Sequence, residues 1–316
     1  MLCYFCSFFR MKTIFQNTFH NTLKTLFIAT TLSMHLFSDP LPALAADVLI
    51  AKDADIKPYQ EVIKGFKQTC DCSVRELDLS DLAALERAVK ARPDAVLAVG
   101  SQSFRKLRKF RTIPVIYTMV MPSETAYVNE ENISGVSMDL APETYLAAMT
   151  ALFPDATRIG VLYDPAHTGT FVQKASDAAS ANGVSLILRK VRDPREVPVL
   201  LDELRGKVDV MWMLPDATLV NSETVDSLLL FSFQRSIPIF SFSNKYVKKG
   251  AVAALTIDPL EIGRQAGTMA KSLFQNSKEP QRAYAGSPCL SVNMNIGKKI
   301  GVRINDELVR SAEKIE

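Results

Sequence analysis

Short runs of β-branched and other apolar residues alternate, from Asp47 onward, with stretches of helical period. This alternation is typical of parallel strands joined by crossover helices, and it constrains the fold more than any other feature of the sequence. Residues 95–99 are apolar at every position, as expected for a strand that is covered on both faces. Because such crossovers are right-handed, each series of strands should form an open, doubly wound sheet. The pattern therefore predicts an α/β fold.

The alternation runs through two series that resemble each other. Arg-Thr-Ile-Pro-Val-Ile at residues 111–116 is matched by Arg-Ser-Ile-Pro-Ile-Phe at residues 235–240. Two similar lobes explain this match, although Ile-Pro-aliphatic also recurs at strand starts in other α/β folds. Residues 251–257 form one more strand, and Asp258 and Pro259 then begin a helix as the chain returns to the first lobe. We predict an N-terminal lobe from residues 46–137 plus 255–283 and a C-terminal lobe from residues 138–254 plus 284–316.

Residues 1–45 have the order of a secretory leader. Basic residues precede an apolar run at 26–37, and Ala43-Leu44-Ala45 then gives the small-x-small pattern of a signal-peptidase site. A membrane anchor is the alternative, but a spanning helix needs about 20 apolar residues and this run is shorter. We predict cleavage near Ala45 and a periplasmic mature protein.

Composition narrows the possible functions. The chain is 47% hydrophobic and 22% charged, which indicates a globular protein, and its formal net charge of +3 provides no broad positive field. No nucleic-acid partner is therefore expected. His167 is the single histidine after the leader, so a multi-histidine metal site is excluded and no metal is expected.

Three cysteines follow the leader, at Cys70, Cys72 and Cys289. One residue separates Cys70 from Cys72, which is too close for an easy unstrained disulfide, although an oxidising compartment can still force one. We expect all three cysteines to be structural or incidental. A redox pair at Cys70 and Cys72 is the alternative.

In open parallel sheets, ligands bind beyond the carboxyl ends of the strands, so two such sheets facing one another predict a shared cleft. Residues 100–103 place backbone N–H groups and hydroxyls at a helix start, which suits an anion, while ordinary capping by Ser101 is the alternative. In the loop 164–170, before a helix expected at 171–181, Asp164 is a candidate partner for a ligand ammonium. The alternative is an Asp-Pro turn with Thr168 or Thr170 capping that helix. The predicted ligand-binding residues are Gly100, Ser101, Gln102, Ser103, Tyr117, Thr118, Asp164, His167, Thr168, Asp216 and Ser241.

Sequence signatures of catalysis are mostly absent. The chain has no Gly-x-Gly-x-x-Gly, no phosphate loop and no Gly-x-Ser-x-Gly elbow. No cofactor and no catalytic residue are expected, and the protein is not predicted to be an enzyme. An exported enzyme that uses Asp164, His167 and Asp216 as acid-base groups is the alternative. The basic run at 105–111 is expected to face water, with docking to a partner as the second interpretation.

Several segments, in order and spacing, resemble a known family: the ABC transporter substrate-binding proteins whose characterised members bind aromatic amino acids. They are Ala-Val-Gly-Ser at 98–101, Ile-Pro-Val-Ile-Tyr-Thr at 113–118, Asn-Ile-Ser-Gly-Val-Ser at 132–137, Arg-Ile-Gly-Val-Leu-Tyr-Asp-Pro at 158–165, Lys-Gly-Ala at 249–251, Ile-Gly-Arg-Gln-Ala-Gly at 262–267, and residues 295–301. The resemblance covers nearly all of the chain after the leader. It implies a type I periplasmic-binding fold with two doubly wound lobes joined by hinge strands.

The resemblance also implies a function. Such a receptor closes its lobes around a small molecule, here an amino acid or a related organic anion, and presents it to the membrane permease of an ABC transporter. A sensor protein is the alternative partner, and the receptor is expected to be a monomer. Where the family usually has an Asp-Pro facing the cleft, this chain has Met121-Pro122, so an ammonium partner is missing at that position.

Overall fold

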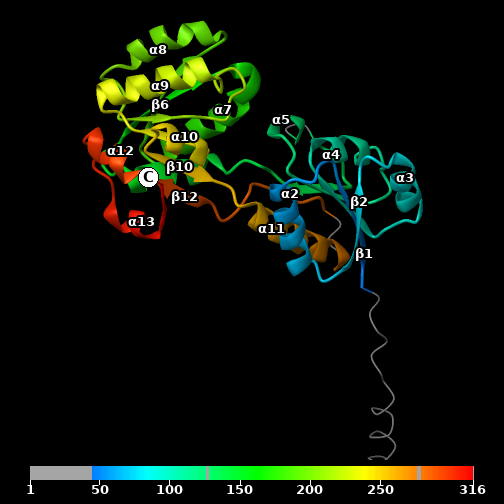
Figure 1. The fold of residues 1–316 in the computed structure, drawn as a ribbon. Coiled ribbons are helices and arrows are strands. Elements are labelled where there is room, and N and C mark those ends of the chain that lie inside the picture. The colour runs from blue at the N-terminus through cyan, green and yellow to red at the C-terminus, as the bar shows by residue number, and fades with distance from the viewer. Residues whose placement is uncertain (1–44, 126–127, 276–278, 316) are drawn as a thin grey trace, which may run out of the picture. The chain divides into compact units, whose positions relative to one another are not determined.

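The computed structural model describes residues 45–125, 128–275 and 279–315 (Figure 1). The predicted leader lies outside the described residues, apart from Ala45 at its end. Within the described ranges, no helix is both long enough and apolar enough to cross a membrane.

The first sheet is built mainly from the first series of strands. Its strand order is β11, β5, β4, β3, β1, β2, and neighbouring strands run parallel. The strands are β1 (Asp47–Lys52), β2 (Ser73–Asp78), β3 (Ala95–Val99), β4 (Val115–Thr118), β5 (Ile133–Val136) and β11 (Arg282–Ala283).

The second sheet has the order β13, β12, β10, β9, β8, β6, β7. Among the described residues its neighbours run parallel except β10 and β12, which are antiparallel. The strands are β6 (Arg158–Tyr163), β7 (Ser185–Lys190), β8 (Val210–Trp212), β9 (Ile239–Ser241), β10 (Ala253–Thr256), β12 (Cys289–Val292) and β13 (Glu313–Lys314). The predicted α/β fold with two doubly wound, mostly parallel sheets is therefore confirmed.

Helices alternate with the strands along the chain, as the periodicity predicts. They are α2 (Lys57–Thr69), α3 (Leu82–Lys90), α4 (Ser101–Leu107), α5 (Pro122–Thr125), α6 (Pro142–Leu152), α7 (Pro165–Ala181), the short 3₁₀ helix η1 (Pro194–Glu196), α8 (Val197–Leu204), α9 (Ser222–Arg235), α10 (Asn244–Lys249), α11 (Pro259–Phe274), α12 (Met294–Lys299) and α13 (Asp306–Ser311).

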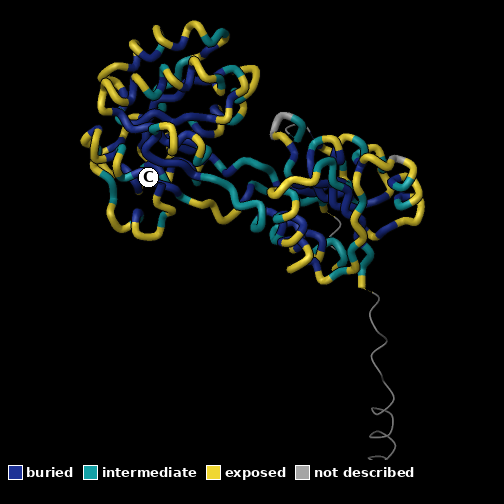
Figure 2. Tube along the Cα trace, in the orientation of Figure 1, coloured by how far each residue is buried: buried dark blue, intermediate teal, exposed yellow. Residues whose placement is uncertain are grey.

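The cores lie where the sequence is continuously apolar. All of β3 is buried, and so are β8, β9 and residues 159–163 of β6. In Figure 2 the central strands of each sheet run dark blue through the interior, while the outer faces of the helices are yellow. Burial on both faces of these strands explains why their sequences lack a polar alternation.

Helix α11 follows β10, a strand of the second sheet, along the chain. It nevertheless packs against α2, the helix that connects β1 and β2 of the first sheet (Figure 1). Glycines make this close approach possible. A Cβ at Gly263 would lie 2.0 Å from the Val62 carbonyl oxygen, and one at Gly65 would lie 2.0 Å from the Leu260 carbonyl oxygen. The two backbones therefore touch at positions where any side chain would force them apart.

Along the part of the chain that the structure describes, the backbone passes between the two sheets three times, at residues 137–141, 257–258 and 284–288. The first and third passages are tied together. Ser137 donates its amide hydrogen to the Ala283 carbonyl at 2.8 Å, and Ala285 donates to the Asp139 carbonyl at 3.0 Å. The strand expected at 251–257 is β10, which pairs along its whole length within the second sheet. The lobe boundaries themselves stay a prediction.

One local expectation is wrong, and the state of two cysteines that the sequence left open is now defined. Helix α7 begins at Pro165 and not at residue 171, because Asp164 caps it and proline is favourable in the first turn, where no N–H partner is needed. Cys70 and Cys72 form a disulfide with Cα atoms 5.3 Å apart. Asp71, between them, has φ of +55°, and this left-handed turn brings the two side chains together. Cys289 is free and exposed.

Candidate functional site

The carboxyl-terminal edge of the first sheet brings the loop after β1 against the start of α4. Because β1 and β3 are neighbours, Asp53, which follows β1, lies beside Gly100, which follows β3. The Asp53 carboxylate accepts the Gln102 amide hydrogen, with 2.7 Å between N and O, and the Ser103 amide hydrogen at 3.4 Å. The N–H groups predicted to capture a ligand anion are thus already bonded to a carboxylate of the protein.

Gly100 makes room for this arrangement. Its φ is +97°, and a Cβ there would lie 2.4 Å from Asp53 Oδ1 and 2.5 Å from the Tyr59 hydroxyl oxygen. Burial, the charge of Asp53 and a hydrogen bond to it raise the pKa of Tyr59 to about 12. Tyr59 therefore stays protonated and donates its hydroxyl hydrogen to Asp53.

The other predicted residues of this lobe divide by exposure. Gln102 is exposed and Ser101 is partly buried, with its hydroxyl oxygen accepting the Met121 amide at 3.3 Å. Ser103 and Thr118 are fully buried, and their hydroxyls have no hydrogen-bond partner among the described residues. Tyr117 is also buried, and its ring lies 5.2 Å from that of Phe104. Ser101 and Gln102 are accordingly the accessible members of this group.

At the matching edge of the second sheet, Asp164 and Asp216 are locked together. The Asp164 amide donates to Asp216 Oδ2 at 2.8 Å, and Thr168 Oγ1 donates to the same oxygen at 2.5 Å. Thr218 donates its hydroxyl to Asp164 Oδ2 at 2.6 Å and its amide to Asp216 Oδ1 at 3.0 Å. Asp216 is fully buried. These hydrogen bonds within the protein hold both loops in place without a ligand.

Asp164 also caps α7, because its Oδ1 accepts the Ala166 amide at 2.9 Å. The hydrogen bond from Thr218 and this capping bond lower the pKa of Asp164, which keeps the side chain ionised. His167 lies one turn along, with 3.9 Å between Nε2 and Asp164 Oδ2, and about half of its side chain is exposed. Asp164, His167 and Thr168 are therefore brought together, with His167 the most accessible.

Ser241, at the end of β9, is fully buried. Its hydroxyl lies 3.8 Å from Met213 Sδ and accepts the Ser243 amide at 3.3 Å. Ser241 thus orders the turn into α10.

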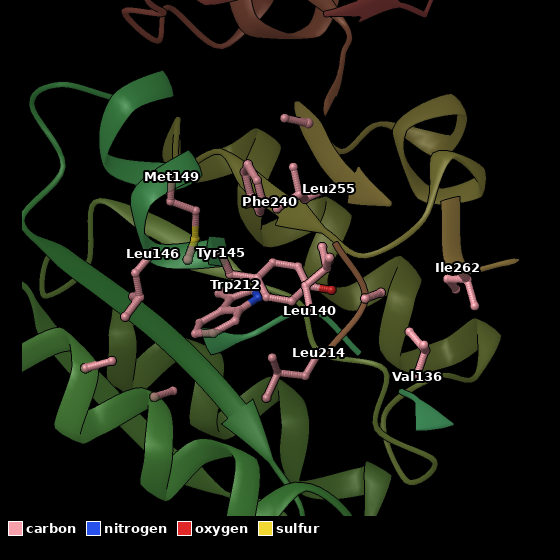
Figure 3. Packing of buried hydrophobic residues seen from close by; sticks show 14 of the residues in the cluster. Val136, Leu140, Tyr145, Leu146, Met149, Trp212, Leu214, Phe240, Leu255 and Ile262 are labelled. Carbon is pink, nitrogen blue, oxygen red and sulfur yellow. The ribbon is translucent and has the colours of Figure 1, made fainter. Parts of the chain in front are cut away.

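An aromatic cluster not predicted from the sequence lies in the same lobe. Tyr145, Phe171 and Trp212 come from α6, α7 and β8, with ring centroids between 5.3 and 6.3 Å apart. Figure 3 shows Tyr145 and Trp212 side by side within the buried cluster. The Trp212 indole nitrogen is buried and has no hydrogen-bond partner among the described residues.

Asp139 lies on the first passage between the sheets. Its side chain is partly buried, and burial alone raises the pKa of Asp139 to about 6. In the described part of the chain, no hydrogen bond or ion pair involves this carboxylate. Asp139 therefore differs from Asp53, Asp164 and Asp216, each of which accepts hydrogen bonds from its own protein.

Sequence reasoning missed Asp53, Tyr59, Thr218 and Asp139. The first three lie beyond strand ends, so the rule that selected the predicted residues applies to them as well. The sequence gives no such signal for Asp139, because its raised pKa results from burial by the folded chain.

Other features do not add to this site. A surface hollow of about 610 Å³ is lined by residues of α6 and α13, and one of about 420 Å³ lies near Phe153, Val208 and Pro238. Neither contains a predicted ligand-binding residue. Among the described residues, no group of three His, Cys, Asp or Glu side chains is arranged to hold a metal ion.

Comparison with known proteins adds a family. The model of the family described as ABC transporter substrate binding protein matches residues 52–316. A protein named tyrosine-binding protein, from Clostridioides difficile (strain R20291), is 28% identical over 196 residues. That match covers 59% of this chain and 56% of the relative, so it spans little more than half of the relative's length.

Solved structures share the fold. A ligand-free, open structure of a substrate-binding protein with adhesive properties from Clostridium difficile has a TM-score of 0.68 at 18% identity, covering 86% of this chain and 99% of that one. A domain from Streptococcus pneumonia in complex with L-Trp has a TM-score of 0.54 at 18% identity, covering 86% of this chain and all of that one.

Proposed function

Since the chain belongs to the family of ABC transporter substrate-binding proteins, we propose that it is an exported receptor that closes two lobes around a small ligand and delivers it to a transporter permease. The observation that carries this proposal is the threefold passage of the chain between two doubly wound sheets. Short connecting segments of this kind allow hinge closure, because a few residues absorb the change in backbone angles.

The ligand is an amino acid with an aromatic side chain. The names of two similar proteins support this class, since one is a tyrosine-binding protein and the other is in complex with L-Trp. Ser101, Gln102, His167 and Thr168 are the predicted residues that a ligand reaches in the described conformation. Asp164 is buried beside His167. Ser103, Thr118, Asp216 and Ser241 are buried and hold the loops in place.

Export follows from the basic, apolar and small-x-small order of residues 1–45. The mature protein is then periplasmic, where it meets both its ligand and the permease. Binding without chemical change is the activity, and Asp164, His167 and Asp216 serve the site without catalysis.

A ligand screen tests this function. Protein beginning at Ala46 is mixed with L-tyrosine, L-tryptophan, an aliphatic amino acid and a neutral sugar, and its melting temperature is measured. Tyrosine or tryptophan should raise the melting temperature by mass action, while the sugar should not. Small-angle scattering should then show a smaller radius of gyration with the bound ligand. Failure of both aromatic amino acids to bind, or a radius unchanged at saturation, contradicts the proposal.

A further inference from the structure

We propose that this protein docks on an anionic lipid bilayer through exposed apolar and lysine side chains where α9, α10 and α12 end. The inference goes beyond the proposed function, because it concerns neither the ligand nor the permease. The region, called here the basic end surface, consists of Leu230, Phe233, Lys248, Lys249, Lys298 and Lys299.

Two large apolar side chains lie next to each other on the outer face of α9. Leu230 is 58% exposed and Phe233 is 49% exposed, and three residues, or about one helical turn, separate them. Val225, Leu228 and Phe231 already bury the inner face of the same helix. An outer face that meets only water is normally polar. The last turns of α9 therefore present apolar surface that none of the described residues covers.

The ends of α10 and α12 lie against this part of α9. Lys299 Nζ, at the end of α12, is 5.0 Å from the centroid of the Phe233 ring. Gly250 ends α10, and a Cβ there would lie 3.4 Å from Leu229 Cδ2. The three helices belong to the same lobe (Figure 1). Their contacts thus bring lysines from two helix ends to the exposed apolar side chains of a third.

The four lysines of the basic end surface are exposed, and none of them forms an ion pair with a described residue. Their place in the last turns of α10 and α12 is favourable for the helix dipoles. That role needs no acidic side chain, so the four charges stay available to an anion. Asp226 lies one turn before Leu230 on α9, and the basic end surface begins beyond it.

Lysines around projecting apolar side chains match the chemistry of an anionic bilayer. The ammonium groups meet the charged headgroups, while leucine and phenylalanine side chains enter the boundary of the hydrocarbon. A protein partner would instead anchor its side chains in pockets. Neither Leu230 nor Phe233 lines either of the two surface hollows described above, so these side chains project. A lipid surface is the occupant that needs no pocket.

This surface lies away from the candidate ligand site. Helices α9 and α10 lead into β9 and β10, so they end at the amino-terminal edge of the second sheet. Asp164 and Asp216 lie at the opposite, carboxyl-terminal edge. Docking on a bilayer therefore leaves the ligand-binding edge free, and it should not depend on the ligand.

Vesicle sedimentation with protein beginning at Ala46 tests the inference. One set of vesicles contains only phosphatidylcholine, and in the other set half of the lipid is phosphatidylglycerol. The parent chain should sediment with the anionic vesicles and at least about tenfold less with the neutral ones. Binding should weaken when salt is raised from about 0.1 M to about 1 M, because the Debye length falls from about 10 Å to about 3 Å.

Two pairs of substitutions test the two kinds of contact. Lys298→Gln together with Lys299→Gln should weaken binding to anionic vesicles at least about tenfold. The control is Lys90→Gln together with Lys109→Gln, at exposed positions of the first lobe, which removes the same charge and should bind like the parent.

Leu230→Ser together with Phe233→Ser should weaken binding to the anionic vesicles at least about fivefold, because apolar area no longer enters the bilayer. Val199→Ser is its control, at a position on α8 that is 67% exposed, and should bind like the parent. Equal sedimentation with both kinds of vesicle, or with neither, overturns the inference. Equal losses in a test pair and its control also overturn it. If the parent binds poly-glutamate as tightly as anionic vesicles and the serine pair binds like the parent, the surface docks an acidic protein instead.

Discussion

Replacing Asp139 by asparagine should stabilise the unliganded protein at neutral pH and leave it unchanged in acid. In the folded state, burial raises the pKa of Asp139 from 3.8 to about 6. The folded chain therefore binds more protons than the unfolded chain between these two values, and this residue's contribution to stability falls as the pH rises through that window. A shift of about 2 pKa units, at about 1.4 kcal/mol per unit, makes the ionised carboxylate unfavourable by about 3 kcal/mol at pH 7.

Asparagine keeps the shape of the side chain but does not ionise. Urea unfolding of the parent and of Asp139→Asn, followed by circular dichroism, measures the difference across the pH range. The variant should be more stable by about 1 to 3 kcal/mol at about pH 7, and the gap should close once the pH falls below the unfolded pKa, at about pH 3. Asp202→Asn, in which no buried charge is removed, should follow the parent throughout.

Two results would refute this reasoning. A constant difference between Asp139→Asn and the parent across the pH range would mean that the carboxyl group does not titrate near 6. A variant that is less stable than the parent at neutral pH would mean that the ionised carboxylate has a favourable partner within the protein.

Two further predictions concern the fold. Gly263→Ala should lower the free energy of unfolding by more than about 2 kcal/mol, since its Cβ would lie 2.0 Å from the Val62 carbonyl oxygen. Gly169→Ala, in α7, where the Cβ would meet only the Pro165 side chain at 3.7 Å, controls for the substitution, and equal losses in urea unfolding would contradict the close packing. In oxidised protein beginning at Ala46, iodoacetamide should modify Cys289 and leave Cys70 and Cys72 unmodified until a reductant is added. Mass spectrometry measures the modification, and modification of Cys70 or Cys72 without reductant would mean that the disulfide is not formed.

The site illustrates how far pattern reasoning reaches. The rule that ligands bind beyond strand ends selected residues 100–103, Asp164 and Asp216, and the structure does gather Asp164, His167, Thr168 and Asp216 at one edge of the second sheet. The rule did not reveal that Asp164 and Asp216 accept hydrogen bonds from Thr218 and Thr168. Hydrogen-bond partners depend on which loops meet, and no local pattern carries that information.

What the sequence by itself determined is the architecture: two doubly wound sheets follow from the spacing of apolar runs, because strand and helix periods and the burial of parallel strands are local properties. The tertiary structure decided the state of each polar group. Asp53 and Gln102 meet because β1 and β3 are neighbours in the sheet, and Asp164 and Asp216 meet because β6 and β8 are. Among the residues that the structure describes, Asp139 has no hydrogen-bond partner for its carboxylate, and the reason is the same: the groups around a carboxylate come from distant parts of the chain, and folding decides which of them it meets.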